Sequence, residues 1–290
     1  MIRKRRKHFS ALGLKWNPFS SDVPTESLLG SPQLDSFCWR VENLAGDGGF
    51  ALVTGDPGTG KSCSLRYLGQ RLRAERDLEI GELTRPQSSI ADLYRELGSC
   101  FHVELKPHNR WAGSEALRKC WQTQIDRVFF HPVLIVDEAQ EMAPKTLNEL
   151  RFLASSKLDT RSLLTVILAG DSRLPELFTH ESLLSLGTRM RVRLTLAPRT
   201  PAELEEHLSH LLAEAGAPQL MTRELKRTLC DHAAGNLRTL TNLGNDLLDA
   251  AVQRDLEKLD EKLFFDVFTP SSSRGHRGRA KARETSNDSR

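Results

Sequence analysis

The chain has 290 residues, of which 39% are hydrophobic and 27% are charged, and a formal net charge of +3. This composition is typical of a folded protein with room for one large core and a smaller domain. No apolar run approaches the ~18 residues of a membrane span, and no apolar segment follows the basic N-terminus as a secretory signal requires. The five cysteines form no C-x-x-C pair, so we expect neither a disulfide framework nor a zinc site, and a reducing cytoplasm as the compartment.

The charge is unevenly distributed along the chain. Residues 1–21 carry a charge of +6 and residues 271–290 carry +4, which leaves the body between them at about −7. Basic arms on an acidic body favour contact with nucleic acid or an acidic partner. For the C-terminal arm, a solvated tail that aids solubility is an open alternative.

Strands and helices alternate along the first two thirds of the chain. After a basic flexible arm over residues 1–13, Ser31-Pro32 predicts a helix start, since serine caps well and proline suits the first turn. The alternation implies right-handed crossovers and a parallel sheet, so we expect an α/β fold with helices on both faces. The expected strands cover residues 50–54, 78–83, 132–136, 163–169 and 191–196, and the helices among them cover residues 63–72, 88–100, 113–129 and 145–154.

The pattern changes after Pro198. Three helical stretches, over residues 201–215, 222–234 and 237–256, follow one another with no strand between them. They predict a small all-helical domain over residues 199–268, after an α/β domain over residues 14–198. Pro270 and the serine run after it predict a disordered basic tail over residues 269–290.

Residues 55–62 match the phosphate-binding pattern G-x-x-x-x-G-K-[ST], known as the Walker A or P-loop motif, in full. A chance glycine-rich turn is the alternative, but an expected strand before the motif and a helix after it favour the phosphate site. The glycines let backbone N–H groups turn toward phosphate oxygens, and the helix N-terminus favours the same anion. Lys61 would reach the outer phosphates and Ser62 would bind magnesium. The predicted nucleotide-binding residues are Gly55, Asp56, Pro57, Gly58, Thr59, Gly60, Lys61, Ser62 and Cys63.

Two carboxylates follow the apolar run of residues 132–136, as in a Walker B motif. An apolar run without alternation predicts a strand covered on both faces of a parallel sheet, and ligands bind at the carboxyl ends of such strands. Asp137 would then face the magnesium ion, and Glu138 would orient or polarise the attacking water. Solvated turn acids are the alternative interpretation of this pair taken alone.

A nucleotide-binding domain followed by a small helical domain resembles an AAA+ ATPase of the P-loop class, in which the helical domain is a lid. Asn17-Pro18-Phe19, residues 137–140, residues 169–171 and residues 235–238 resemble the ExeA-like group over roughly residues 14–250. That group includes TnsC-like and IstB-like transposition ATPases, which select target DNA and activate a transposase. The resemblance implies ATP and Mg²⁺ as cofactors and hydrolysis of ATP to ADP and phosphate. It also implies a homo-oligomer, as a ring or helical filament, with double-stranded DNA and a transposase or other recombination protein as partners and no membrane.

The resemblance assigns further residues. Asp171 matches the polar sensor that contacts the γ-phosphate or the water, although asparagine is common there. Arg238 matches the second sensor on the lid, with a surface arginine as the alternative. Arg189 matches the arginine finger that enters a neighbouring subunit's site, and Arg191 is the other candidate. Lys61, Asp137 and Glu138 complete the implied catalytic set.

Candidate DNA contacts fall in two groups. In related ATPases, segments around the second helix face the central channel, which points to Arg85, Lys106 and Arg110. The arm would add diffuse attraction through Arg3, Lys4, Arg5, Arg6 and Lys7. The alternatives are an ExeA-like secretion ATPase, whose relatives are longer and carry a membrane helix, and a replication-initiator or clamp-loader ATPase, which shares the fold.

Overall fold

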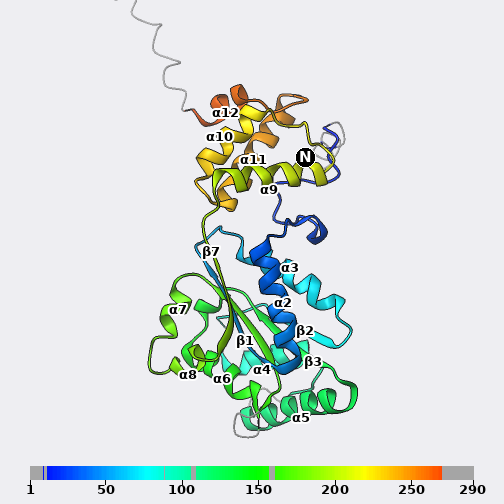
Figure 1. Cartoon of the computed structure of the whole chain (residues 1–290), viewed down its shortest axis with the longest axis vertical. Coiled ribbons are helices and arrows are strands. Elements are labelled where there is room, and N and C mark those ends of the chain that lie inside the picture. The colour runs from blue at the N-terminus through cyan, green and yellow to red at the C-terminus, as the bar shows by residue number, and fades with distance from the viewer. Residues whose placement is uncertain (1–8, 10–11, 88, 106–108, 157–160, 270–290) are drawn as a thin grey trace, which may run out of the picture.

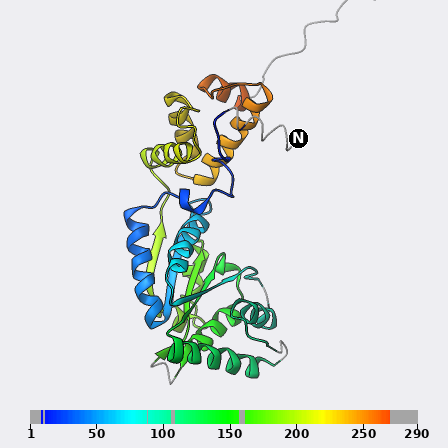
Figure 2. The same ribbon diagram turned by 90° about the vertical axis from the view of Figure 1, so that its right-hand side faces the viewer.

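A computed structural model of the chain describes residue 9 and residues 12–87, 89–105, 109–156 and 161–269. The arm residues 3–7, Lys106 and the predicted tail from residue 270 lie outside these ranges. Two lobes follow one another along the long axis of the molecule (Figures 1 and 2). The first contains a sheet between layers of helices, and the second is a bundle of helices.

A parallel sheet forms the centre of the first lobe. Within the described ranges it has five strands in the order β2-β3-β6-β1-β7. Its edges are β2 and β7, and every neighbouring pair is parallel, which confirms the predicted α/β fold. The strands are β1 (Gly49–Gly55), β2 (Leu78–Leu83), β3 (His131–Val136), β6 (Thr165–Gly170) and β7 (Met190–Leu196). A separate two-stranded antiparallel ladder joins β4 (Ser155–Ser156) to β5 (Arg161–Ser162).

Alternate residues of each central strand face opposite helical layers. In β3, Val133 and Ile135 pack with α2 (Pro32–Asp47) and α3 (Lys61–Ala74), while Leu134 and Val136 belong to the core on the other face. Because both faces are covered, every residue of the strand from Pro132 onward is buried, and the sequence shows no alternation. The layer on the second face consists of α4 (Ile90–Cys100), α5 (Arg110–Val128) and α6 (Pro144–Ala154).

Short helices connect the main elements. They are η1 (Thr25–Ser27), η2 (Ala139–Glu141), α7 (Arg173–Leu177) and α8 (Leu184–Gly187). The helix start predicted at Ser31 is confirmed, since the Ser31 hydroxyl accepts a hydrogen bond from Leu34 N. One prediction was wrong: α5 begins at Arg110 rather than at Gly113, because the Asn109 side chain caps it by accepting a hydrogen bond from Ala112 N. Arg110 is therefore a helix residue and not part of a polar loop.

The second lobe contains α9 (Pro201–Glu214), α10 (Arg223–Ala233), α11 (Leu237–Gln253) and α12 (Glu261–Phe268). The fourth of these helices was not predicted. Asp260 caps it, and Leu263 and Phe264 bury it in the bundle. The bundle has its own hydrophobic core, which includes Leu14 and Phe19 from before the sheet. This separate core supports the proposed division of the chain near residue 198.

None of the helices in the described ranges combines the length and the apolar composition needed to cross a membrane.

Candidate nucleotide-binding and catalytic site

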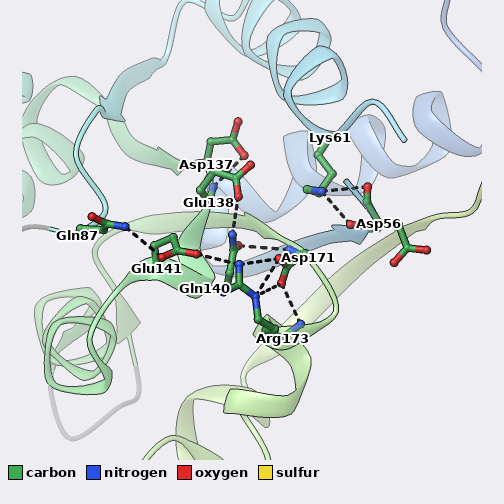
Figure 3. Close-up of polar contacts among 10 residues, drawn as sticks. Asp56, Lys61, Gln87, Asp137, Glu138, Gln140, Glu141, Asp171 and Arg173 are labelled. Carbon is green, nitrogen blue, oxygen red and sulfur yellow. Dashed lines mark hydrogen bonds and ion pairs between the residues drawn. The ribbon is translucent and has the colours of Figure 1, made fainter. Parts of the chain in front are cut away.

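The phosphate-binding pattern, residues 55–62, runs from the last residue of β1 through a turn to the second residue of α3, so a strand precedes it and a helix follows it as predicted. Gly58 and Gly60 adopt φ values of +86° and +104°, which only glycine adopts without strain. Lys61 is 6% exposed, and its Nζ donates hydrogen bonds to the carbonyl oxygens of Gly55 (2.8 Å) and Asp56 (3.2 Å). The ammonium group is thus held inside the loop, where an anion bound by the loop would meet it (Figure 3).

Ser62 and Asp137 meet although 75 positions separate them in the sequence. The Ser62 hydroxyl donates to Asp137 Oδ2 at 2.7 Å, and Asp137 Oδ1 accepts from Glu138 N at 2.9 Å. The parallel sheet brings them together, because Asp137 follows β3 and Ser62 lies in the first turn of α3, which follows β1. A hydroxyl and a carboxylate are oxygen donors of the kind Mg²⁺ prefers when phosphates and water complete its shell. The residues present therefore fit a magnesium–nucleotide complex.

Glu138 has an unusual backbone. Its φ of +51° and ψ of +39° lie in the left-handed region, which is rare for a residue other than glycine. Its side chain is exposed, and one carboxylate oxygen accepts a hydrogen bond from Gln140 Nε2. Non-glycine residues in such conformations cluster at functional sites.

Asp171 follows β6 and is paired with Arg173. The guanidinium of Arg173 donates to both Asp171 carboxylate oxygens, and its Nη2 also bonds Glu141 Oε1 at 2.8 Å (Figure 3). These hydrogen bonds from Arg173 hold the pKa of Asp171 below its usual range. The predicted sensor is therefore an ionised carboxylate with a cation beside it, which reduces the repulsion that a lone carboxylate would exert on a phosphate.

The helical lobe touches the phosphate loop directly. Asn236 Nδ2 donates to the carbonyl oxygen of Pro57 at 2.9 Å, and Leu237 N donates to that of Gly58 at 3.0 Å. A Cβ atom on Gly58 would overlap the side chain of Asn236, so the close approach itself requires glycine. Arg238 is exposed and follows in the first turn of α11, on the side of the lobe that meets the loop.

The two candidate fingers lie at the other end of the sheet. Arg189 is partly exposed just before β7, and its Nε donates to Ser185 O at 3.2 Å, while Arg191 is exposed on the strand. The register pairs Phe50 with Met190 and Gly55 with Leu196. Arg189 is thus about six residues, or roughly 20 Å, from its own phosphate loop, and we infer that it cannot serve that loop.

Arg110 and Arg85, two of the predicted DNA contacts, differ in their surroundings. Arg110 is 60% exposed, but Glu149, which is buried, accepts hydrogen bonds from its guanidinium, so that part of its charge is neutralised within the protein. Arg85 is exposed and lines a cavity of 640 Å³ to which Glu138 also contributes. The structure thus places Arg85 near the candidate catalytic carboxylate.

Two buried side-chain nitrogen atoms in or next to α9 have no hydrogen-bond partner among the described residues. They are Nε of Arg199, which lies between β7 and α9, and Nδ1 of His207 on α9. Burial, with help from the positive charge of Arg199, lowers the pKa of His207 to about 4. Arg199 also interacts electrostatically with Cys63, directly after the phosphate loop. Sequence reasoning did not identify either of these groups.

Comparisons with known proteins agree with this geometry. A family described as "AAA domain" matches residues 44–178. General secretion pathway protein A of Aeromonas hydrophila is 29% identical over 255 residues, which are 85% of this chain and 45% of that protein. The chain therefore spans less than half the length of this curated relative.

Solved structures share the fold at low sequence identity. The ADP form of the Aeropyrum pernix ORC2 protein has a TM-score of 0.71 at 13% identity, covering 89% of this chain and 73% of that one. The Aeropyrum pernix ORC1 protein in complex with DNA has a TM-score of 0.65 at 17% identity, covering 86% of this chain and 67% of that one. At these identities the likeness concerns the fold alone.

Proposed function

We propose that this chain, which is an ExeA-like ATPase of the AAA+ P-loop class, assembles with ATP on double-stranded DNA and there regulates a partner protein. The partner we propose is a transposase or another recombination protein, and the location is the cytoplasm. The observation that carries the nucleotide part is the meeting of Ser62 and Asp137 at 2.7 Å beside Lys61. The DNA part is supported by the fold shared with a DNA-bound ORC1 structure and by the basic ends of the chain.

In the hydrolysis step that we propose, each residue has a separate task. Lys61 and the N–H groups of the phosphate loop bind the phosphates. Ser62 and Asp137 would hold a magnesium ion, which supplies charge neutralisation at the phosphate oxygens. Glu138 accepts the proton of the attacking water, and Asp171 orients that water or the terminal phosphate.

The proposed site is completed by a second copy of the chain. Arg189 is roughly 20 Å from its own loop along β7, so as a finger it would have to act on a neighbouring subunit. Contributed in trans, a finger neutralises charge that develops in the transition state. Hydrolysis would then depend on assembly, and assembly on ATP.

The lid would report the nucleotide through the contacts of α11 with the loop. Asn236 and Leu237 bond two loop carbonyl groups, and Arg238 follows in the same turn. Movement of the loop on nucleotide binding would therefore move the lid. In the proposed assembly Arg85 and the basic arm approach the DNA backbone, which would give binding with little sequence specificity.

Fluorescence anisotropy of a labelled DNA duplex tests this proposal. With ATP, the Glu138→Gln variant should bind the duplex tightly. The affinity should fall steeply with salt, with a slope of about −0.9 in log K against log salt for each phosphate contacted. Without ATP the affinity should be much lower. Equal affinity with and without ATP would point to the basic arms alone.

A second candidate function is favoured by the 29% identity to general secretion pathway protein A. In that case the ATPase would serve a secretion apparatus, and DNA would not be a ligand. No binding of the duplex in any nucleotide state would favour this candidate over the first.

A further inference from the structure

Gln140 connects the two candidate catalytic strand ends. It lies in η2, is 9% exposed, and its side-chain amide has two partners. Nε2 donates to a carboxylate oxygen of Glu138, and Oε1 accepts from the backbone N–H of Asp171 at 3.3 Å. Figure 3 shows the Gln140 side chain between Glu138 and Asp171. One amide thus joins Glu138, the second residue after β3, to Asp171, the first residue after the neighbouring strand β6.

The chemistry of the two partners fixes the orientation of this amide. A backbone N–H can only donate, so the atom facing Asp171 must be the carbonyl oxygen Oε1. The NH₂ group is then left to face Glu138, and it requires an acceptor there. An ionised carboxylate supplies that acceptor, and a hydrogen bond to a charged group is stronger than one between neutral groups.

The amide oxygen of Gln140 lies against Gly170, where no side chain could be accommodated. A Cβ atom on Gly170 would overlap Gln140 Oε1 and would come within 2.8 Å of Leu174 Cδ2. Glu138 itself sits in the left-handed region, and its carbonyl oxygen accepts from Glu141 N at 2.9 Å in the turn that carries Gln140. The left-handed backbone of Glu138, the glycine at position 170 and the buried amide of Gln140 therefore all bear on where the Glu138 carboxylate lies.

From this convergence we propose that Gln140 is a positioning residue that holds the Glu138 carboxylate in the orientation needed to receive a proton from the attacking water. The inference rests on the proposed role of Glu138. In this role Gln140 contacts neither the nucleotide nor the water. It sets the direction of the carboxylate and ties it to Asp171, so that the two residues act on the water as one unit.

The Gln140→Glu variant tests the inference with little change in shape. The introduced side chain can still accept from Asp171 N, but it presents a carboxylate oxygen to Glu138 where an NH₂ group stood. Glu138 should be repelled from its position, and kcat should fall about 10- to 100-fold, the effect expected when a catalytic group is misplaced by ~1 Å. The affinity for ATP should change less than about twofold, because Lys61 and Ser62 are untouched.

Gln124→Glu is the matched control. Gln124 Nε2 also donates to a carboxylate, Glu79 Oε2, at 2.8 Å, but Glu79 lies near the amino end of β2, away from the site. The same repulsion arises there, so this variant should lose thermal stability while keeping its kcat. Equal losses of kcat in the two variants would overturn the inference, because a general loss of fold quality would then explain both.

The double variant with Glu138→Gln separates positioning from a merely structural role. If Gln140 acts through Glu138, adding Gln140→Glu to Glu138→Gln should lower kcat no further. A further drop of tenfold or more in the double variant would contradict the inference. If Glu138→Gln alone keeps normal turnover, the proposed role of Glu138 fails first. If Glu138→Gln is inactive while Gln140→Glu is fully active, only the inference about Gln140 fails.

Discussion

The side-chain amide of Asn236 donates a 2.9 Å hydrogen bond to the carbonyl oxygen of Pro57, and so ties the helical lobe to the phosphate loop. The same side chain caps α11, since its Oδ1 accepts from Thr239 N at 3.1 Å. The oxygen and the nitrogen of this amide thus have different partners. The oxygen starts the helix, and the nitrogen holds the loop.

Asn236→Asp should separate these two tasks. Aspartate caps a helix as well as asparagine does, so α11 should keep its start. The variant places a carboxylate oxygen against the Pro57 carbonyl in place of a donor, and we expect the loop and the lid to part. Because one lost hydrogen bond costs about 1 kcal/mol, ATP affinity should fall roughly fivefold, as measured with a fluorescent ATP analogue.

Asn43→Asp is the control for this substitution. Asn43 Nδ2 also donates to a backbone carbonyl oxygen, that of Trp39, at 2.7 Å on the exposed face of α2. Its loss should leave nucleotide affinity unchanged. If Asn236→Asp binds the analogue as tightly as Asn43→Asp does, the contact between lobe and loop plays no part in nucleotide binding.

Lys61→Ala and Glu138→Gln should fail at different steps. Lys61→Ala removes the ammonium group held inside the loop and should abolish tight ATP binding. Glu138→Gln keeps the pair of Ser62 and Asp137, so it should bind ATP within a few-fold of the unmodified protein. Its rate of hydrolysis should be lower by a factor of about 100 or more. Equilibrium binding and single-turnover hydrolysis separate the two. Tight binding by Lys61→Ala would refute the assignment of the loop.

Mixing two inactive variants tests the role of Arg189. Arg189→Ala has an intact phosphate loop, and Lys61→Ala has an intact finger. In a mixed assembly, the finger of a Lys61→Ala subunit can serve the loop of an Arg189→Ala subunit, so part of the ATPase activity should return. Hetero-oligomers without any recovered activity would rule out action in trans. The same mixture can be made with Arg191→Ala in place of Arg189→Ala. If ATPase activity returns only in the mixture with Arg191→Ala, Arg191 is the finger.

Stability toward acid should depend on His207. The pKa of this half-buried imidazole is lowered to about 4, mainly by burial and then by Arg199 and His210. The unfolded chain titrates near pH 6.5, so between about pH 6.5 and 4 it binds a proton that the folded chain does not. The free energy of unfolding should therefore fall through this window as pH falls, by about 1–2 kcal/mol after solvent screening.

Urea unfolding at pH 7 and pH 4.5 measures this effect. His207→Gln should lose less stability between the two pH values than the unmodified protein does. His180→Gln, at an exposed position, should lose as much as the unmodified protein. An equal loss in all three would show that other groups govern the acid response.

The sequence predicted the elements whose signals are local. The phosphate loop, the apolar strand before Asp137 and the cap at Ser31 each follow from residues close together in the chain, and the structure has them within a few residues of the prediction. The start of α5 was misplaced because Asn109 was taken as a loop residue rather than as a helix cap. The helix α12 was missed since its burial depends on packing against the rest of the bundle.

The links within the site could not be predicted, because they depend on register and on approach between distant segments. Nothing local indicates that Gln140 lies against Asp171, or that Arg173 neutralises that carboxylate. The contact of Asn236 with Pro57 joins segments 179 residues apart. The sequence explains the glycines of the loop by the turn of the backbone toward phosphate, but a second reason for glycine at position 58, the close approach of Asn236, is visible only in three dimensions.

The mass of the complex formed on DNA tests the central claim most directly. Light scattering after size separation should be measured for Glu138→Gln with a defined DNA duplex, with ATP, with ADP and without nucleotide. We expect a complex of several subunits per duplex with ATP only. The double variant that carries Glu138→Gln and Lys61→Ala should not form this complex in any nucleotide state. A protein that stays monomeric with ATP and the duplex, or that assembles equally without nucleotide, would contradict the proposed ATP-dependent assembly on DNA.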